Sequence, residues 1–305
     1  MPSSTPYQQT LETDPLYVPG QLIVKFETQV IIQIDSVLTN SDELNDLLKE
    51  VGVIAIEPMI QWPNDEKPKD FPEIDSYYIL ELPSDANILS ARNALLQSES
   101  IDFVIPNYIL HIDEPNVSLN AVKSENPKNI SNTFIQDPND TYYNHVSYPQ
   151  WPLHNDHLQF RSAWDITTGS SDIVVAVLDT GLDTTHPDIG NKNTGTGYNF
   201  IDNSYNITDD YGHGTLVSGL IAANSNNNSG ITGICWGCRI MPVKVCDSVG
   251  DCSTLDVING MLWAANHGAD IINMSLTRDI LDTGYTEPAT HIQQFFNYCI
   301  TMVLS

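Results

Sequence analysis

The stretch DIVVAVLDTG, residues 172–181, decides how the second half of this chain folds. Its first eight residues form a near-continuous apolar run, which is typical of a strand buried on both faces of a parallel sheet. Asp179 ends this run, and Thr180 and Gly181 follow where the chain must turn. Open α/β sheets place their sites at the carboxyl ends of strands, so we expect Asp179 to lie at a functional edge.

Strand and helix patterns alternate after this strand. Helical periodicity covers 213–223 and 253–268, and apolar strand patterns cover 239–245 and 269–276, although Pro242 weakens the first of these two strands. A further helix is expected in ATHIQQFFNYC and a further strand at 300–304. The alternation predicts an α/β domain with a doubly wound, mostly parallel sheet from residue 140 onward.

Residues 17–112 have the pattern of a separate, small α+β domain. Strand, helix, strand, strand, helix and extended segments are expected in turn at 21–27, 41–52, 53–59, 76–83, 86–97 and 101–112. This β-α-β-β-α-β order predicts a ferredoxin-like arrangement. Residues 1–16 form a polar N-terminal segment, and residues 113–139, rich in Asn, Ser and Pro, are expected to be a linker.

The charge balance excludes some classes of partner. The 305 residues hold 39 acidic and 12 basic side chains, a net charge of -27. Such a surface repels phosphates, so neither nucleic acid nor an anionic membrane is an expected partner. No apolar run reaches the ~18 residues of a membrane span, and residues 1–16 lack the apolar core of a signal peptide.

Five cysteines lie at 235, 238, 246, 252 and 299, four of them within 18 residues. Two short-range disulfides, Cys235–Cys238 and Cys246–Cys252, a small zinc site and free buried thiols are all compatible with these spacings. Cys299 has no cysteine nearby in sequence and is expected to pack as a small apolar group.

His213 is the second candidate for chemistry. It stands between two glycines at the expected start of a helix, where an imidazole acts as a general base or merely binds a nearby carbonyl. Asp179, taken alone, could equally cap a loop. A hydrolytic metal centre is a further alternative, built from Asp179, Asp183, His186, Asp188 and His213.

Taken together, these segments resemble the subtilisin-like serine proteases, and the thermitase branch in particular. The residues that carry the resemblance are SAWDITTGSSDIVVAVLDTGLDTTHPDI, YNFIDN, HGTLVSGLIAA, IMPVKV and ADIINMSL, in the family's order and spacing. The first domain resembles the inhibitor-type propeptide of the same enzymes, with VPGQLIVKF near its start and PNYILH near its end. The resemblance implies a subtilisin-type sheet and a serine endopeptidase precursor acting on polypeptides.

By this resemblance Asp179 orients His213, and His213 takes the proton from a serine. The family's nucleophile lies in a G-T-S-M-A-like turn and its oxyanion asparagine in an A-G-N stretch, and neither is present in these residues. We therefore expect the sequence to be the N-terminal part of the catalytic domain, about three residues short of the asparagine and inactive alone. The rival hypothesis is a truncated, inert protein that binds a related protease through residues 17–112.

The resemblance also implies bound calcium. Carried over residue by residue, the ligands are Asp140, Asp188, the Asn227 side chain and the carbonyls of Asn224, Ser229 and Ile231. Ca²⁺ takes such oxygen ligands, six to eight at a time. A weaker second site is implied around Asn199, Asp202, Ser204, Asn206 and Thr208, where two of the usual acids are missing.

Substrate is expected to lie as a strand between Gly250-Asp251-Cys252 and Ser275-Leu276-Thr277. The family usually has glycine where Cys252 and Thr277 stand, and Arg278 also departs from its pattern. The propeptide is expected to inhibit its own enzyme until it is cut within 113–139, after the segment PNYILHID. Calcium and the candidate disulfides favour a secreted protein, and we expect a monomer.

Overall fold

A computed structural model describes residues 17–33, 37–60, 76–112, 137–154 and 158–277. The chain divides into two compact units, one made of residues 1–59 and 75–109 and the other of residues 60–74 and 110–305. The division thus falls three residues before the end of the predicted first domain. The expected helix at 289–299, the expected strand at 300–304 and Cys299 lie outside the described residues.

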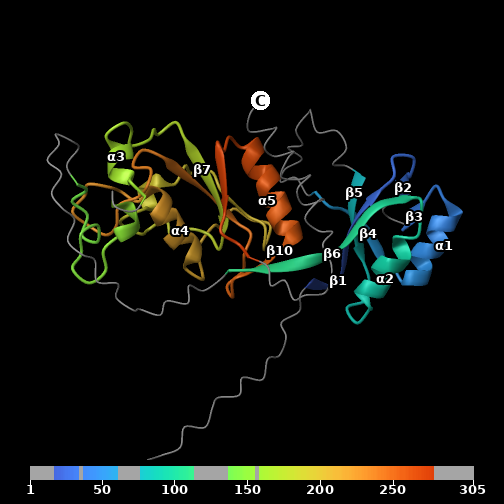
Figure 1. Ribbon diagram of the computed structural model, residues 1–305. Helices are drawn as coiled ribbons and strands as arrows, with labels where there is room; N and C mark the ends of the chain where they lie inside the picture. Colours follow the sequence, from blue (N-terminus) through green and yellow to red (C-terminus); the bar gives the residue numbers. More distant parts are fainter. Residues whose placement is uncertain (1–16, 34–36, 61–75, 113–136, 155–157, 278–305) are drawn as a thin grey trace, which may run out of the picture. The chain divides into compact units, whose positions relative to one another are not determined.

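The first unit is built on an antiparallel sheet with the strand order β6-β1-β5-β4 (Figure 1). Its strands are β1 (Tyr17–Phe26), β4 (Ala55–Pro58), β5 (Tyr77–Glu81) and β6 (Ile101–His111). The sequence predicted each of these strands. It did not predict the short pair β2 (Ile32–Gln33) and β3 (Leu38–Thr39).

Two helices complete this unit, and each begins at a side-chain cap. Helix α1 (Asp42–Val51) is capped by Ser41 and stops at Gly52, whose φ of 86° favours glycine. Helix α2 (Ile88–Leu95) is capped by Asn87. Their apolar faces meet the sheet in a buried core that includes Leu22, Val24, Leu44, Leu48, Leu80, Ile88 and Leu95.

The second unit is built on a parallel sheet, as predicted. Its strands are β7 (Val174–Asp179), β8 (Tyr198–Asn199), β9 (Arg239–Lys244) and β11 (Ile271–Met274), in the order β11-β7-β9-β8. Every residue of β7 is buried, which is the reason for its continuous apolar run. Pro242 is accommodated within β9, opposite Val177 of β7.

The faces of this parallel sheet are covered by different helices (Figure 1). Val175 and Val177 of β7 pack with Val217 of α4 (His213–Ala222). Leu178 points to the other face, where it approaches Gly260 of α5 (Thr254–Asn266). The smaller elements of the unit are α3 (Phe160–Trp164), the 3-10 turns Trp151–Leu153 and Gly190–Lys192, and β10 (Asp251–Ser253).

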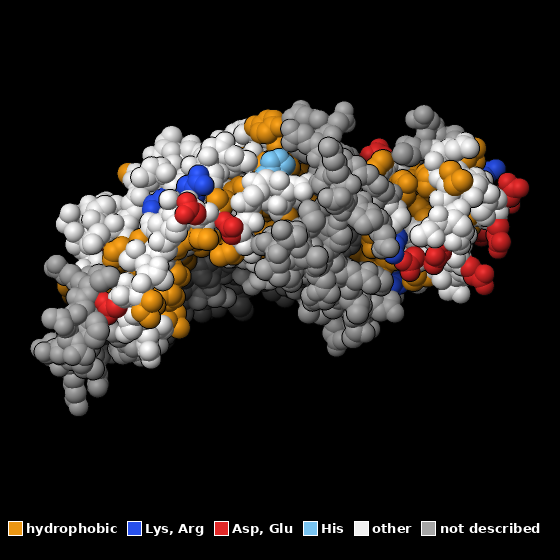
Figure 2. Space-filling model, turned by 90° about the horizontal axis from the view of Figure 1, so that it is seen from above, with side chains coloured by type: hydrophobic (Ala, Val, Ile, Leu, Met, Phe, Trp, Pro, Cys, Tyr) orange, Lys and Arg blue, Asp and Glu red, His pale blue; other side chains and the backbone are white. Residues whose placement is uncertain are grey.

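Both predicted disulfides are present. Cys235–Cys238 and Cys246–Cys252 are bonded, so these four cysteines form neither a zinc site nor free thiols. The second bond joins the chain just after β9 to β10. Within the described parts of the chain, none of the helices has the length and apolar character needed to cross a bilayer. Acidic side chains are scattered over the face drawn in Figure 2, in keeping with the net charge of -27.

Candidate active site

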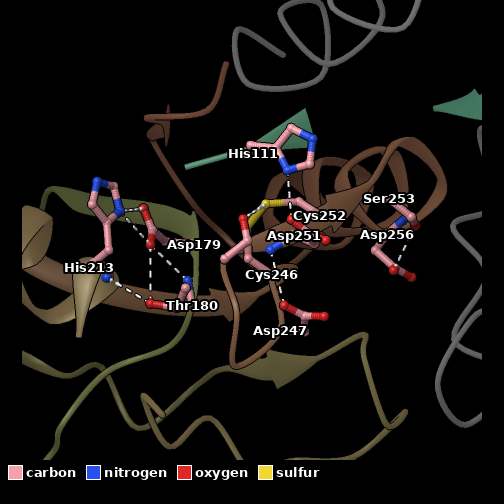
Figure 3. The surroundings of a disulfide bond; sticks show 12 residues. His111, Asp179, Thr180, His213, Cys246, Asp247, Asp251, Cys252, Ser253 and Asp256 are labelled. Atoms are coloured by element: carbon pink, nitrogen blue, oxygen red, sulfur yellow. Dashed lines mark hydrogen bonds and ion pairs between the residues drawn. A yellow bond between two sulfur atoms is a disulfide. The ribbon is translucent and has the colours of Figure 1, made fainter. Parts of the chain in front are cut away.

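Asp179 and His213 face each other across the carboxyl edge of the parallel sheet. Asp179 is the last residue of β7 and is fully buried, and His213 is the first residue of α4. His213 Nδ1 lies 2.8 and 2.9 Å from the two carboxylate oxygens of Asp179 (Figure 3). The imidazole is therefore fixed by a buried carboxylate at one nitrogen, which leaves Nε2 on the far side of the ring.

The glycines around this pair allow the helix to approach the strand closely. A Cβ on Gly214 would lie 2.3 Å from the carbonyl oxygen of Gly181, and Gly181 itself has a φ of 119°. The Gly214 N–H donates to the hydroxyl of Thr180 at 2.9 Å. Only glycine at both places lets the start of α4 lie against the turn after β7.

Asp209 organises the start of α4, and sequence reasoning missed this role. Its carboxylate accepts hydrogen bonds from the backbone N–H groups of Gly212 and Thr215 and from the hydroxyl of Thr180. An acid just before a Gly-His-Gly helix start is a capping signal that could have indicated it. Asp209 thus ties the turn that bears Asp179 to the helix that bears His213.

Burial and hydrogen bonding together shift the pKa values of Asp179 and Asp209 in opposite directions. Burial raises the pKa of Asp179, although the hydrogen bonds from His213 and Thr180 partly offset the shift. Burial also raises the pKa of Asp209, but there the hydrogen bonds from Thr215 and Gly212 outweigh it and the net pKa is lowered. A buried carboxylate such as Asp179 stabilises a protonated imidazole beside it more strongly than a solvated one would.

The two segments predicted to flank a peptide do flank an extended strand of the chain itself. Residues 110–112, at the end of β6, belong to the second unit. His111 and Thr277 exchange both backbone hydrogen bonds, at 2.8 and 2.9 Å, and the Ile112 N–H donates to the Gly250 carbonyl at 3.1 Å. Cys252 is buried and bonded to Cys246.

The residues predicted to bind calcium converge on one loop. Asp140 and Asp188 are both about 5% exposed. The Asp140 carboxylate accepts from the N–H groups of Asn226 and Asn227, and the Asp188 carboxylate accepts from the Ile231 N–H and the Asn227 side chain. The predicted ligands Asn224 and Ser229 also lie in this loop; the Asn224 N–H donates to the Asp188 carbonyl, and the Ser229 N–H to the Asn227 side-chain oxygen.

The donor set at this loop suits a hard divalent cation. Burial raises the pKa of Asp140, and the nearby Asp188 charge raises it further, although backbone hydrogen bonds partly offset both effects. No ion pair is shown between either carboxylate and a Lys or Arg among the described residues. A Cβ on Gly230 would fall on the Asp188 carboxylate, so the loop is shaped around these oxygens.

The region of the weaker second site is a hollow of about 370 Å³. Its lining includes Asn199, Asp202, Asn206, Thr208, Asp210, Lys244 and Asp247. Within the described ranges no group of three or more His, Cys, Asp or Glu side chains is placed to hold a metal, and this applies to the loop 224–231, which brings only Asp140 and Asp188 together, as well as to this hollow. The residues of the alternative hydrolytic metal centre are engaged separately, because the Asp183 carboxylate accepts hydrogen bonds from Thr185 and the Asp188 carboxylate accepts from the Ile231 N–H.

An aspartate buried at the end of a parallel strand and paired with the first histidine of the next helix can orient that imidazole for proton transfer. Residues 170–301 match the model of the subtilase family. The match contains Asp179, His213 and both disulfides. It starts well after the first unit, so it covers the second unit alone.

Two curated relatives are similar to this chain over longer stretches. A thermophilic serine proteinase from Bacillus sp. (strain AK1) is 33% identical over 263 residues, 86% of this chain and 53% of that protein. Thermitase from Thermoactinomyces vulgaris is 36% identical over 162 residues, 53% of each chain. The chain therefore spans about half the length of these relatives.

A solved structure shows the same fold at lower sequence similarity. The crystal structure of a mutant of the epidermin leader peptide processing serine protease from Staphylococcus aureus superimposes with a TM-score of 0.52 and 16% identity. The superposition covers 93% of this chain and 59% of that one. At this identity the likeness concerns the fold alone.

Proposed function

We propose that this chain carries the aspartate and the histidine of a serine endopeptidase that acts on polypeptides. The observation that carries the proposal is the contact of His213 Nδ1 with both carboxylate oxygens of Asp179. It holds the imidazole so that Nε2 takes the proton of a serine hydroxyl and later protonates the leaving amine. Asp179 orients the ring and stabilises the imidazolium that forms.

The serine nucleophile and the oxyanion-hole asparagine are proposed to come from sequence other than these 305 residues, which contain neither G-T-S-M-A nor A-G-N. Ser218 is no substitute, because it is fully buried on α4, one helical turn past His213. Loss of the nucleophile alone removes most of the catalysis of such a site, and these residues lack the oxyanion-hole asparagine as well.

The 305-residue polypeptide is accordingly expected to be inert. Incubated with casein it should release no peptides, and a fluorophosphonate probe should label none of its serines. Thermitase treated in parallel provides the positive control. Site-specific labelling of any serine in the 305 residues would show that the nucleophile has been wrongly excluded.

We further propose that residues 17–112 are a propeptide that inhibits the catalytic domain. The order of strands and helices in the first unit supports the ferredoxin-like arrangement of such inhibitors. The backbone hydrogen bonds of His111 with Thr277 and of Ile112 with Gly250 support occupation of the groove by the propeptide's end. Residues 113–139 then contain the bond that is cut on maturation.

Residues 17–112, produced alone, are expected to inhibit a longer chain in which residues 140–305 are joined to a nucleophile-bearing subtilase segment. Residues 17–109 form the matched control, because they lack only the strand that pairs with Thr277 and Gly250. Inhibition at micromolar concentration by the longer fragment and much weaker inhibition by the shorter one are expected. Equal potency of the two fragments would exclude a role of residues 110–112.

The absence of a nucleophile segment also favours a second candidate function, in which the chain is an inert protein that binds a related protease through its first unit. In that case the 305-residue chain itself would inhibit thermitase. The endopeptidase proposal expects no such inhibition, because residues 110–112 already occupy the groove of their own chain.

Calcium is proposed to bind between Asp140, Asp188 and the loop 224–231, where it would link the start of the catalytic domain to the segment after α4. The ion would supply positive charge beside two buried carboxylates. Secretion is proposed because two disulfides persist only in an oxidising compartment. A monomer is proposed for the mature protein.

A further inference from the structure

The side chain of His111 contacts an acid at the edge of the groove. His111 Nδ1 lies 2.6 Å from an oxygen of Asp251, the first residue of β10 (Figure 3). The backbone of the same His111 is paired with Thr277 through two hydrogen bonds. The chain's own strand therefore presents an N–H donor to a carboxylate at a fixed register.

The Asp251 carboxylate is held in place by its surroundings. The Asp251 N–H donates to the Asp247 side chain at 3.0 Å, and the Asp251 carbonyl accepts from the Asp247 N–H at 2.9 Å. Cys252, the next residue, is fixed to Cys246 by the disulfide. Lost side-chain and backbone freedom is a main cost of binding, so this bracing makes Asp251 a preorganised acceptor.

The neighbouring groove position has a different character. Ile112 is only 7% exposed, whereas the side chains of His111 and Asp251 are 24% and 36% exposed. A Cβ on Gly250 would touch both the ring of Tyr211 and the Cβ of Ile112, so this position is apolar and close-packed. The groove position that His111 occupies therefore selects a peptide side chain by its charge, and the position that Ile112 occupies selects it by its shape.

We propose that Asp251 makes the groove selective for peptides with a basic side chain at the position paired with Thr277. A lysine, an arginine or a protonated histidine at this position gains a charge-assisted hydrogen bond, while a glutamate meets the like charge of the Asp251 carboxylate. The inference rests on the proposed peptide-binding role of the groove and names the substrate class that it prefers. It assigns Asp251 as the residue that determines this preference.

The chain's own strand provides the test, because it is a tethered peptide that already occupies the groove. The measured quantity is the hydrogen-exchange protection of the Ile112 and Thr277 backbone amides, corrected for intrinsic exchange rates. His111→Arg, His111→Ala and His111→Glu are compared in the full 305-residue chain. Protection should fall in that order, with about a fivefold loss from Arg to Ala, as for a partly exposed ion pair, and a further loss to Glu.

Three backgrounds make the test specific to Asp251. In the Asp251→Asn background, the amide protection of the three His111 variants should differ by less than twofold. In the Asp251→Lys background, the order of their protection should be reversed. Asp172→Lys, the same charge change on an exposed residue before β7, should leave the spread unchanged. Amides of β7 report in every variant whether the parallel sheet is still folded.

An unchanged spread in Asp251→Asn, or equal protection of all three variants in the native background, would overturn the proposal. None of these measurements needs a nucleophile. A failure here therefore concerns only the recognition by Asp251, whereas a failure of the Asp179–His213 assignment would appear in catalytic assays.

Discussion

Replacing His213 with alanine is expected to lower peptide turnover by at least about 10⁴-fold in a longer chain that joins these residues to a nucleophile-bearing subtilase segment. Serine is a weak nucleophile at its free pKa, and the imidazole of His213, held by Asp179, is the base proposed to activate it. Casein hydrolysis and the rate of fluorophosphonate labelling measure the loss.

Asp179→Asn tests the second half of the pair. It should lower turnover somewhat less than His213→Ala, because an amide that donates to Nδ1 favours the wrong histidine tautomer but preserves the shape of the site. His145→Ala, which removes a histidine whose Nδ1 accepts hydrogen bonds from the Ser147 and Tyr148 N–H groups, serves as the control and should change turnover little. Near-wild-type activity of either site variant would refute the roles assigned to Asp179 and His213.

Asp188→Asn is expected to remove most of the stabilisation by calcium. An ion that binds only the folded chain stabilises it by about 2.7 kcal/mol at a hundredfold excess over its dissociation constant. Asp188 is buried with Asp140 beside the loop 224–231, and the loss of one of these two charges weakens the hold on a divalent ion. Melting temperatures measured in calcium and in chelator, at modest salt, give the response of each variant.

Asp202→Asn is the matched control for that experiment. Asp202 lies in the hollow near Asn199, where Asn199 itself is occupied by hydrogen bonds to Ile201 and Asn206. This variant should keep most of the calcium response. Equal melting curves of the parent chain with and without chelator would show that the loop 224–231 is only a polar connection.

The sequence predicted the parts of the fold whose signal is local. The apolar run before Asp179 specified a fully buried strand, and Ser41, Gly52 and Ser253 marked helix ends that the structure shows at those places. Each of these signals depends on residues within one turn or one strand of each other. The short pair β2–β3 lacked such a signal, because each strand contains only two residues.

The parts that could not be predicted depend on contacts between distant residues. The His111–Asp251 contact joins positions 140 residues apart, and nothing in either segment alone indicates the other. The cysteine spacings were compatible with several chemistries until the geometry fixed the pairs. The Asp179–His213 pair was predicted only because both residues lie in segments that resemble motifs of the family. Taken alone, Asp179 could cap a loop and His213 could bind a nearby carbonyl at a helix start.

The protonation of the two ring nitrogens of His213 tests the central claim most directly, and it can be measured by nitrogen NMR on the 305-residue chain itself. In the neutral ring, the pairing with Asp179 predicts a proton on Nδ1 and none on Nε2. Asp179→Asn should abolish this preference. A proton on Nε2 in the parent chain would contradict the account, because His213 could then not accept a proton from a serine at that nitrogen.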